Sequence, residues 1–151
     1  MRQRVLKAAV FAVALAGVVS GNAEAQKAKT GAQVYATCTA CHQANGQGLP
    51  GAFPPLAGSE WVTGRAEIPI AIVLHGMQGE VTVKGAKYNS VMTPWGTTFS
   101  DQEIANVVTY IRSQWGNKAP AVMVADVAKV RAATKARKQS FTAAELRKAY
   151  P

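Results

Sequence analysis

A regular helical pattern of apolar positions occupies residues 100–116. Ser100 followed by Glu103 forms a capping box, which marks the start of a helix, and Gly116 is expected to end it. Apolar residues then recur at intervals of three and four and would share one face: Ile104, Val107, Val108 and Ile111. Such a face has to be buried against another element of the fold.

A first helix near residue 31 is the expected partner for that face. It would start at Thr30 or Gly31, continue through Tyr35 into the segment that contains both cysteines, and end before Gly46. Gly31 has no Cβ and would allow two helix backbones to approach closely. We therefore expect the first helix to pack against the helix at 100–116 with Gly31 at the contact.

Residues 49–74 change from loop to helix. Prolines and glycines are concentrated in residues 49–58, which predicts an irregular loop. Residues 68–74 are mainly apolar, with Pro69 near their start and Gly76 just beyond their end. The alternation of apolar residues would also fit a strand, but a proline in the first turn favours a helix.

Helical patterns continue after the helix at 100–116. A narrow stripe at helical spacing consists of Met123, Val127, Val130 and Thr134. Thr142 and Glu145 form a further capping box, with Phe141 and Leu146 placed as a staple across it, which predicts a short final helix. Together these patterns predict an all-α fold.

Positive charge is concentrated in the C-terminal part of the chain. The 151 residues have a formal net charge of +9. Residues 26–117 contain six lysines and arginines against five acidic residues, whereas residues 118–151 contain eight against two. We therefore divide the chain into a signal segment (1–25), a main domain (26–117) and a basic helical C-terminal extension (118–151).

Residues 1–25 have the features of a secretory signal peptide. Arg2, Arg4 and Lys7 precede an apolar run at residues 8–19, and a small-x-small cleavage site follows at residues 23–25. The run is short for a helix that crosses a bilayer, although an uncleaved N-terminal anchor is the alternative. We expect cleavage, export and a periplasmic location.

The two cysteines belong to the motif Cys38-Thr39-Ala40-Cys41-His42, which is typical of covalent haem c attachment. Two thiols three residues apart can reach the vinyl groups on one porphyrin edge, and the next residue can place its imidazole under the iron. One covalent haem c is expected, with His42 as the proximal iron ligand.

Other uses of these cysteines are disfavoured. The chain has only two cysteines and two histidines, too few at the wrong spacing for a zinc site. The residues before Cys38 have a helical pattern, whereas a thioredoxin-like pair follows a strand. A disulfide across so short a loop would recover little closure entropy.

Met92 is the candidate for the second axial position of the iron. It lies in a segment with a proline and a tryptophan, between the attachment motif and the helix at 100–116. A thioether is a soft, neutral ligand, and ligation by histidine and methionine raises the reduction potential. His75 and Met77, just beyond the middle helix, are alternative ligands, and Met123 is a weaker one.

These features resemble the class I cytochromes c. The resemblance rests on the Cys38–His42 motif, the proline segment at 53–56, the Met92 segment and the capped helix that contains Tyr110, and it covers about residues 31–117. It implies the class I cytochrome c fold, in which helices pack around one covalently attached haem. It also implies that both cysteines form thioether bonds.

The resemblance implies further roles around the haem. Met92 would be the distal iron ligand. Pro54, twelve residues after His42, would accept a hydrogen bond from the other ring nitrogen of that ligand, and Pro50 and Pro55 are the alternatives. Three further side chains are expected to line the haem crevice: Leu56, Tyr88 and Trp95.

An iron with both axial positions filled can only change its charge. We therefore expect an electron carrier, not an enzyme, that works between a dehydrogenase-type donor and an oxidase-type acceptor in the periplasm. A fixed cytochrome subunit of a dehydrogenase or terminal oxidase complex is the alternative. A vacant position would instead favour a haem enzyme or a gas sensor, but the sequence shows no distal acid and base pair for such chemistry.

The basic extension has two interpretations. Its helices can lie along the haem domain with a solvated basic face, or they can dock on an acidic redox partner or an anionic lipid surface. Nucleic acid is not an expected partner, because an exported haem protein rarely meets it.

Overall fold

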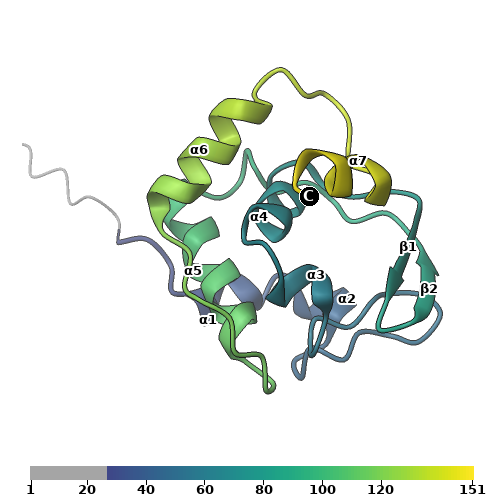
Figure 1. The fold of residues 1–151 in the computed structure, drawn as a ribbon. Coiled ribbons are helices and arrows are strands. Elements are labelled where there is room, and N and C mark those ends of the chain that lie inside the picture. The colour runs from purple at the N-terminus through teal and green to yellow at the C-terminus, as the bar shows by residue number, and fades with distance from the viewer. Residues whose placement is uncertain (1–26) are drawn as a thin grey trace, which may run out of the picture.

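The computed structural model describes residues 27–151 and shows a mainly helical chain with one small hairpin (Figure 1). The predicted signal peptide lies outside the described residues. The helical fold agrees with the prediction, whereas the hairpin was not predicted. The elements in chain order are α1 (Gly31–Tyr35), α2 (Thr39–His42), α3 (Glu60–Thr63), α4 (Glu67–His75), β1 (Glu80–Val83), β2 (Ala86–Asn89), α5 (Asp101–Ser113), α6 (Val124–Thr134) and α7 (Ala143–Ala149).

Helix α5 begins as its sequence predicts. The Ser100 hydroxyl accepts a bond from the Glu103 amide, and the Glu103 carboxylate accepts one from the Ser100 amide. The predicted apolar face is buried in the core: Ile104, Val107, Val108 and Ile111. The helix ends at Ser113, before Gly116, which follows in a turn with φ 85°.

Helix α1 packs against α5 with Gly31 at the contact, as predicted. A Cβ on Gly31 would collide with the carbonyl oxygen of Asn106 and lie 2.6 Å from Cβ of Tyr110. Tyr35, at the end of α1, has its ring centroid 5.4 Å from that of Tyr110. The absence of a side chain at position 31 therefore sets how closely the two helices approach.

The prediction of one continuous first helix is wrong. The chain leaves α1 through a tight turn at residues 36–38, where the Cys38 amide donates to the carbonyl of Tyr35 at 2.8 Å, and α2 starts at Thr39. A bond to the third preceding residue is tighter than the bond of an α-helix. The turn separates α1 from the attachment motif, which forms a short helix of its own, α2.

Helix α4 and the hairpin form another side of the fold. The predicted middle helix is present, with Pro69 in its first turn and Gly76 as its C-cap at φ 75°. The hairpin of β1 and β2 is antiparallel, with Val81 opposite Tyr88. Trp61 of α3 fixes it by donating its indole N–H to the carbonyl of Thr82 at 2.8 Å.

The C-terminal extension lies along the rest of the molecule. Helix α6 packs beside α4 and α5, and α7 follows it over the fold (Figure 1). Val127 and Val130 are buried as the predicted stripe requires, but Met123 is 66% exposed and does not belong to it. The guanidinium of Arg131 joins the extension to α5 through a 2.7 Å ion pair with Asp101. Among the helices of residues 27–151, none has the length and apolar character needed to cross a membrane.

Replacing Gly31 by alanine tests the crossing of α1 and α5. Alanine is the better helix former, so intrinsic propensity alone would stabilise the protein. The collision with Asn106 should instead lower the free energy of unfolding by ~1–3 kcal/mol, as other overpacked contacts do. Urea unfolding of the holoprotein measures the change. The exposed Ala32→Ser variant in the same helix is the control, and equal stability of both variants would contradict the tight crossing.

Candidate functional site

The attachment motif consists of α2 and the residue before it. Cys38 is the residue before the helix, and Cys41 and His42 form its last turn. The His42 amide donates to the Cys38 carbonyl at 2.9 Å, which keeps the cysteines and the histidine on one turn. His42 is 8% exposed, although histidine is polar, so its ring must find its partners inside the protein.

The His42 ring is fixed by one hydrogen bond. Its Nδ1 lies 3.0 Å from the carbonyl oxygen of Pro54, which can only accept, so the proton must be on Nδ1. Burial lowers the pKa of His42, because it disfavours the charged ring, although the bond to Pro54 opposes this effect. A neutral ring with its proton on Nδ1 leaves the Nε2 lone pair for a metal.

The loop at residues 49–58, which we call the proline loop, is held in place from two sides. The carbonyl of Gly46 accepts bonds from the amides of Leu56 (2.8 Å) and Ala57 (3.0 Å). Asn117 lies on the other side, is only 5% exposed, and uses its side-chain amide three times. It donates to the carbonyls of Leu56 and Ile111 at 3.0 and 2.7 Å and accepts from the Gly58 amide at 2.8 Å.

Nothing in the sequence indicated a structural role for Asn117. A lone asparagine after a glycine at the end of a helix is typical of a solvent-exposed turn. Its partners come from the proline loop and from α5, and only the folded chain brings them together.

A large apolar cavity opens beside His42. The cavity, counted together with the open solvent at its mouth, occupies about 1210 Å³. The lining comes from α2, the proline loop, α3, α4, the hairpin, α5 and the segment at residues 90–95 that contains Met92. It includes all but one of the residues expected from the sequence: Cys38, Cys41, His42, Pro54, Leu56, Met92 and Trp95.

Tyr88 departs from the expectation that it lines the crevice. It is buried in β2, opposite Val81, but is not among the residues that line the cavity. The hairpin contributes Val81 and Val83 to the lining instead. The alternation of valines in Glu80–Val83 was the available signal for this strand, because every second residue of a strand faces the same side.

Cys38 does not have the properties of a reactive thiol. Burial and the neighbouring Cys41 raise the pKa of the Cys38 thiol to about 11. Reactive and metal-binding thiols instead sit where positive charge or a helix N-terminus lowers the pKa. Two cysteines at the edge of a large apolar cavity, next to a neutral imidazole, fit covalent attachment of a porphyrin.

Two methionines line the same cavity. The backbones of Met77 and Met92 form an isolated antiparallel bridge, with amide-to-carbonyl bonds of 3.1 and 2.8 Å. Side chains of directly opposite residues project to the same side of such a pair. Met77 therefore remains close to the cavity as an alternative to Met92, and both belong to its lining.

His75 lies away from the cavity. It ends α4, and its Nε2 is 2.7 Å from the hydroxyl oxygen of Thr134 in the extension. It is not part of the cavity lining. His75, expected just beyond the middle helix, is instead its last residue and packs against the C-terminal extension.

The fold and the site together define a protein that carries a covalently attached haem among helices. The chain matches the sequence model of the cytochrome c family over residues 28–115. It belongs to the cytochrome c family, and the Cys38–His42 motif binds haem c covalently.

Similar proteins include some named as cytochromes c and others named as cytochrome subunits of dehydrogenases. Cytochrome c-552 of Thermus thermophilus is 50% identical over 91 residues, which cover 58% of this chain and 69% of that protein. Cytochrome c-554(548) of Halomonas halodenitrificans is 34% identical over 95 residues, covering 63% of this chain and 99% of that protein. The cytochrome c subunit of the quinone alcohol dehydrogenase of Gluconacetobacter polyoxogenes is 39% identical over 105 residues, covering 67% of this chain but 22% of that subunit.

These relatives establish electron transfer as the function of the chain. It works as an electron carrier and not as an enzyme in its own right, and its partners are redox proteins. A buried, mostly apolar setting suits this role, because the burial and polarity of a haem site are levers on its reduction potential.

Replacing Asn117 by alanine tests how the proline loop is held. The substitution leaves two carbonyls and one amide without their partner in a buried position, and each such loss is expensive. The free energy of unfolding of the holoprotein should fall by roughly 2–4 kcal/mol. Asn45→Ala, which removes a bond between an exposed side chain and the Gln47 amide, is the control and should be nearly neutral. A loss no larger than that of the control would show that Asn117 does not support the loop.

Proposed function

We propose that this cytochrome carries one electron on an iron held by His42 and Met92. The observation that supports the proposal best is that both side chains line one apolar cavity while hydrogen bonds hold the His42 ring and the backbone of Met92. The bound haem supplies a one-electron change of charge at its iron. The protein binds it through Cys38 and Cys41 and orients the imidazole through Pro54.

The composition of the cavity supports a carrier. Among the described residues that line it, none is aspartate, glutamate, lysine or arginine. Enzymes that act on peroxide or similar substrates need a positioned acid or base to move protons. With no such group at hand and a thioether in the sixth position, the site excludes substrate and changes only its charge.

Replacing Met92 by alanine tests the ligand assignment. We expect the ferrous variant to bind carbon monoxide readily and to lose the near-infrared band of methionine-ligated ferric haem. Wild type and the Met77→Ala variant should bind carbon monoxide poorly. Met123→Ala, which changes an exposed methionine of the extension, is the control for handling and oxidation. If Met77→Ala opens the iron and Met92→Ala does not, Met77 is the ligand.

We further propose that the protein is a periplasmic shuttle between a dehydrogenase-type donor and an oxidase-type acceptor. The similarity to cytochrome c-552, whose name does not describe it as a subunit, supports this role. The similarity to a quinone alcohol dehydrogenase subunit supports a fixed subunit equally well. Release of the haem protein with the periplasmic fraction favours the shuttle, and purification from membranes in a stable complex favours the subunit.

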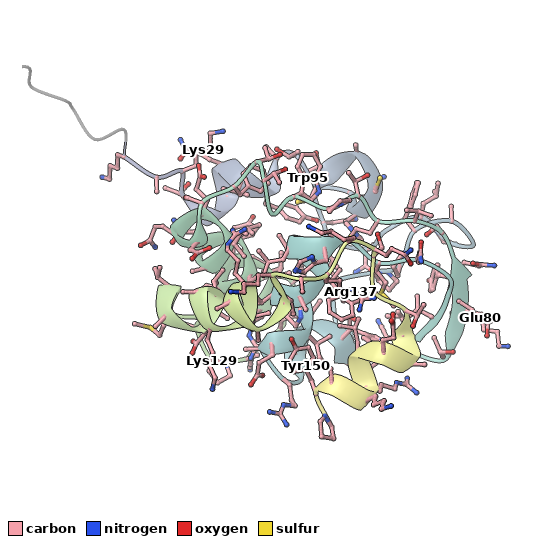
Figure 2. The ribbon with its side chains drawn as sticks, turned by 90° about the horizontal axis from the view of Figure 1, so that it is seen from above. Lys29, Glu80, Trp95, Lys129, Arg137 and Tyr150 are labelled. Carbon is pink, nitrogen blue, oxygen red and sulfur yellow. The ribbon has the colours of Figure 1, made fainter. Side chains whose placement is uncertain are left out.

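The extension supplies a charged surface for docking. Arg131 and Arg137 form ion pairs inside the molecule, with Asp101 and Glu145 respectively. Besides Lys118 at its start, four exposed lysines of the extension have no ion pair within the described part of the chain: Lys129, Lys135, Lys138 and Lys148. Figure 2 shows Lys129 pointing outward, whereas Arg137 lies over the body of the fold. We propose that these lysines steer the protein toward a negatively charged redox partner or lipid surface.

Neutralising the four lysines tests this steering without removing the extension, whose buried valines belong to the core. In the variant with all four replaced by glutamine, electron transfer to membranes of the source organism should slow about tenfold at low ionic strength. The difference should shrink in 1 M salt, where the Debye length is about 3 Å. A control variant loses the same charge elsewhere, by Lys→Gln at 27, 29, 84 and 87. Equal rates for the two variants at every ionic strength would contradict steering by the extension.

A further inference from the structure

Three segments that are far apart in the chain pair through their backbones beside the cavity. Residues 76–78 form the middle segment. On one side, Met77 pairs with Met92 through two amide-to-carbonyl bonds of 3.1 and 2.8 Å. On the other side, the Phe141 amide donates to the carbonyl of Gly76 at 3.1 Å, and the Gln78 amide donates to the carbonyl of Phe141 at 2.8 Å. The extension is thus connected to Met92 through one intervening segment.

Gly76 allows the three segments to come this close. Its φ of 75° lies in the left-handed region that favours glycine. A Cβ at this position would collide with the carbonyl oxygen of Met92 and lie 2.9 Å from the Ser140 hydroxyl oxygen. Both outer segments therefore occupy the space that a side chain at position 76 would need.

Phe141 is held by contacts of its side chain as well as by its backbone bonds. Its side chain is 4% exposed and meets the His75 ring edge-on at a centroid distance of 5.8 Å. The guanidinium of Arg137 lies 3.6 Å from the centroid of the Phe141 ring and donates to the Gln139 and Ser140 carbonyls at 2.8 and 2.9 Å. Residues 139–142, which we call the strap, are thus held by apolar and polar contacts together.

The Met92 segment has little support on its outer side. Val91 is 67% exposed, and Thr93 and Pro94 are also exposed. At position 92 the backbone is held by Met77, and the next backbone bond along the chain joins the Trp95 amide to the Val73 carbonyl at 2.8 Å. The position of Met92 therefore depends on how firmly Met77 is held from the other side.

We propose that the strap is a positioning element for Met92, which keeps the sixth ligand on the iron by fixing the segment of Met77. This inference rests on the proposed ligand role of Met92. It makes Phe141 and Gln78 positioning residues, although neither lines the cavity. The extension then supports the redox centre through the segment of Met77 and is more than a carrier of surface charge.

A matched pair of variants at Gln78 tests the strap in the full-length holoprotein. Gln78→Pro removes the N–H that donates to Phe141, while Gln78→Ala keeps it, and the side chain itself is exposed. Proline also favours an extended residue before it, as the bridge at Met77 requires. We expect Gln78→Pro to bind carbon monoxide about tenfold faster than Gln78→Ala, equivalent to ~1.4 kcal/mol in the opening of the ligand. The near-infrared methionine band should weaken while the thioether attachment stays intact.

A second pair of variants distinguishes an effect on Met92 from a general loss of stability. Phe141→Ala should change carbon monoxide binding and the methionine band in the same direction as Gln78→Pro. Val127→Ala, also buried in the extension but outside the strap, should lower the melting temperature and leave both readouts unchanged.

The outcomes separate this inference from the proposed function. If Met92→Ala opens the iron but Gln78→Pro and Phe141→Ala behave like their controls, the positioning role of the strap is wrong. If Met92→Ala stays closed to carbon monoxide, Met92 is not the ligand, and the positioning role falls with it.

Discussion

The hydrogen bond from His42 to the carbonyl of Pro54 is the contact on which the rest of the site depends. It fixes which ring nitrogen carries the proton, and burial keeps the ring neutral by lowering its pKa. Its geometry requires that the proline loop stay in place, and that is the task of Gly46 and Asn117. The orientation of one imidazole therefore depends on three segments: the glycine turn that follows α2, the proline loop and the end of α5. Partners of metal-binding histidines generally orient the ring in this way.

Local signals in the sequence predicted most of the helices and the central chemistry. The capping boxes of α5 and α7, the proline in α4 and the Cys38–His42 motif are each encoded within a few neighbouring residues. Features that depend on distant partners were missed. The hairpin turn at Lys84 and Gly85 lacks the asparagine or aspartate that usually marks such a turn, and Asn117 binds groups far away in the sequence. Met123 fits the helical stripe by spacing, yet the helix begins after it and its side chain points outward.

The described residues separate a cavity without acidic side chains, lysine or arginine from a charged exterior surface. The described lining of the cavity contains no acidic or basic side chain apart from His42, while the extension carries most of the excess positive charge on its surface. A setting of low dielectric penalises the more highly charged ferric state and so favours the reduced iron. Surface lysines act over a Debye length in solvent and influence encounter with a partner. Potential and partner choice can therefore change independently of each other.

The pairing of residues 76–78 with the extension also orders the assembly of the protein in time. During synthesis the Cys38–His42 motif becomes available long before Phe141 does, because the chain is made from its N-terminus. Until Phe141 has arrived, the methionine side of the cavity has only one of its two backbone neighbours. Both cysteines, His42 and Met92 are therefore made before the residue that completes the backbone pairing of residues 76–78.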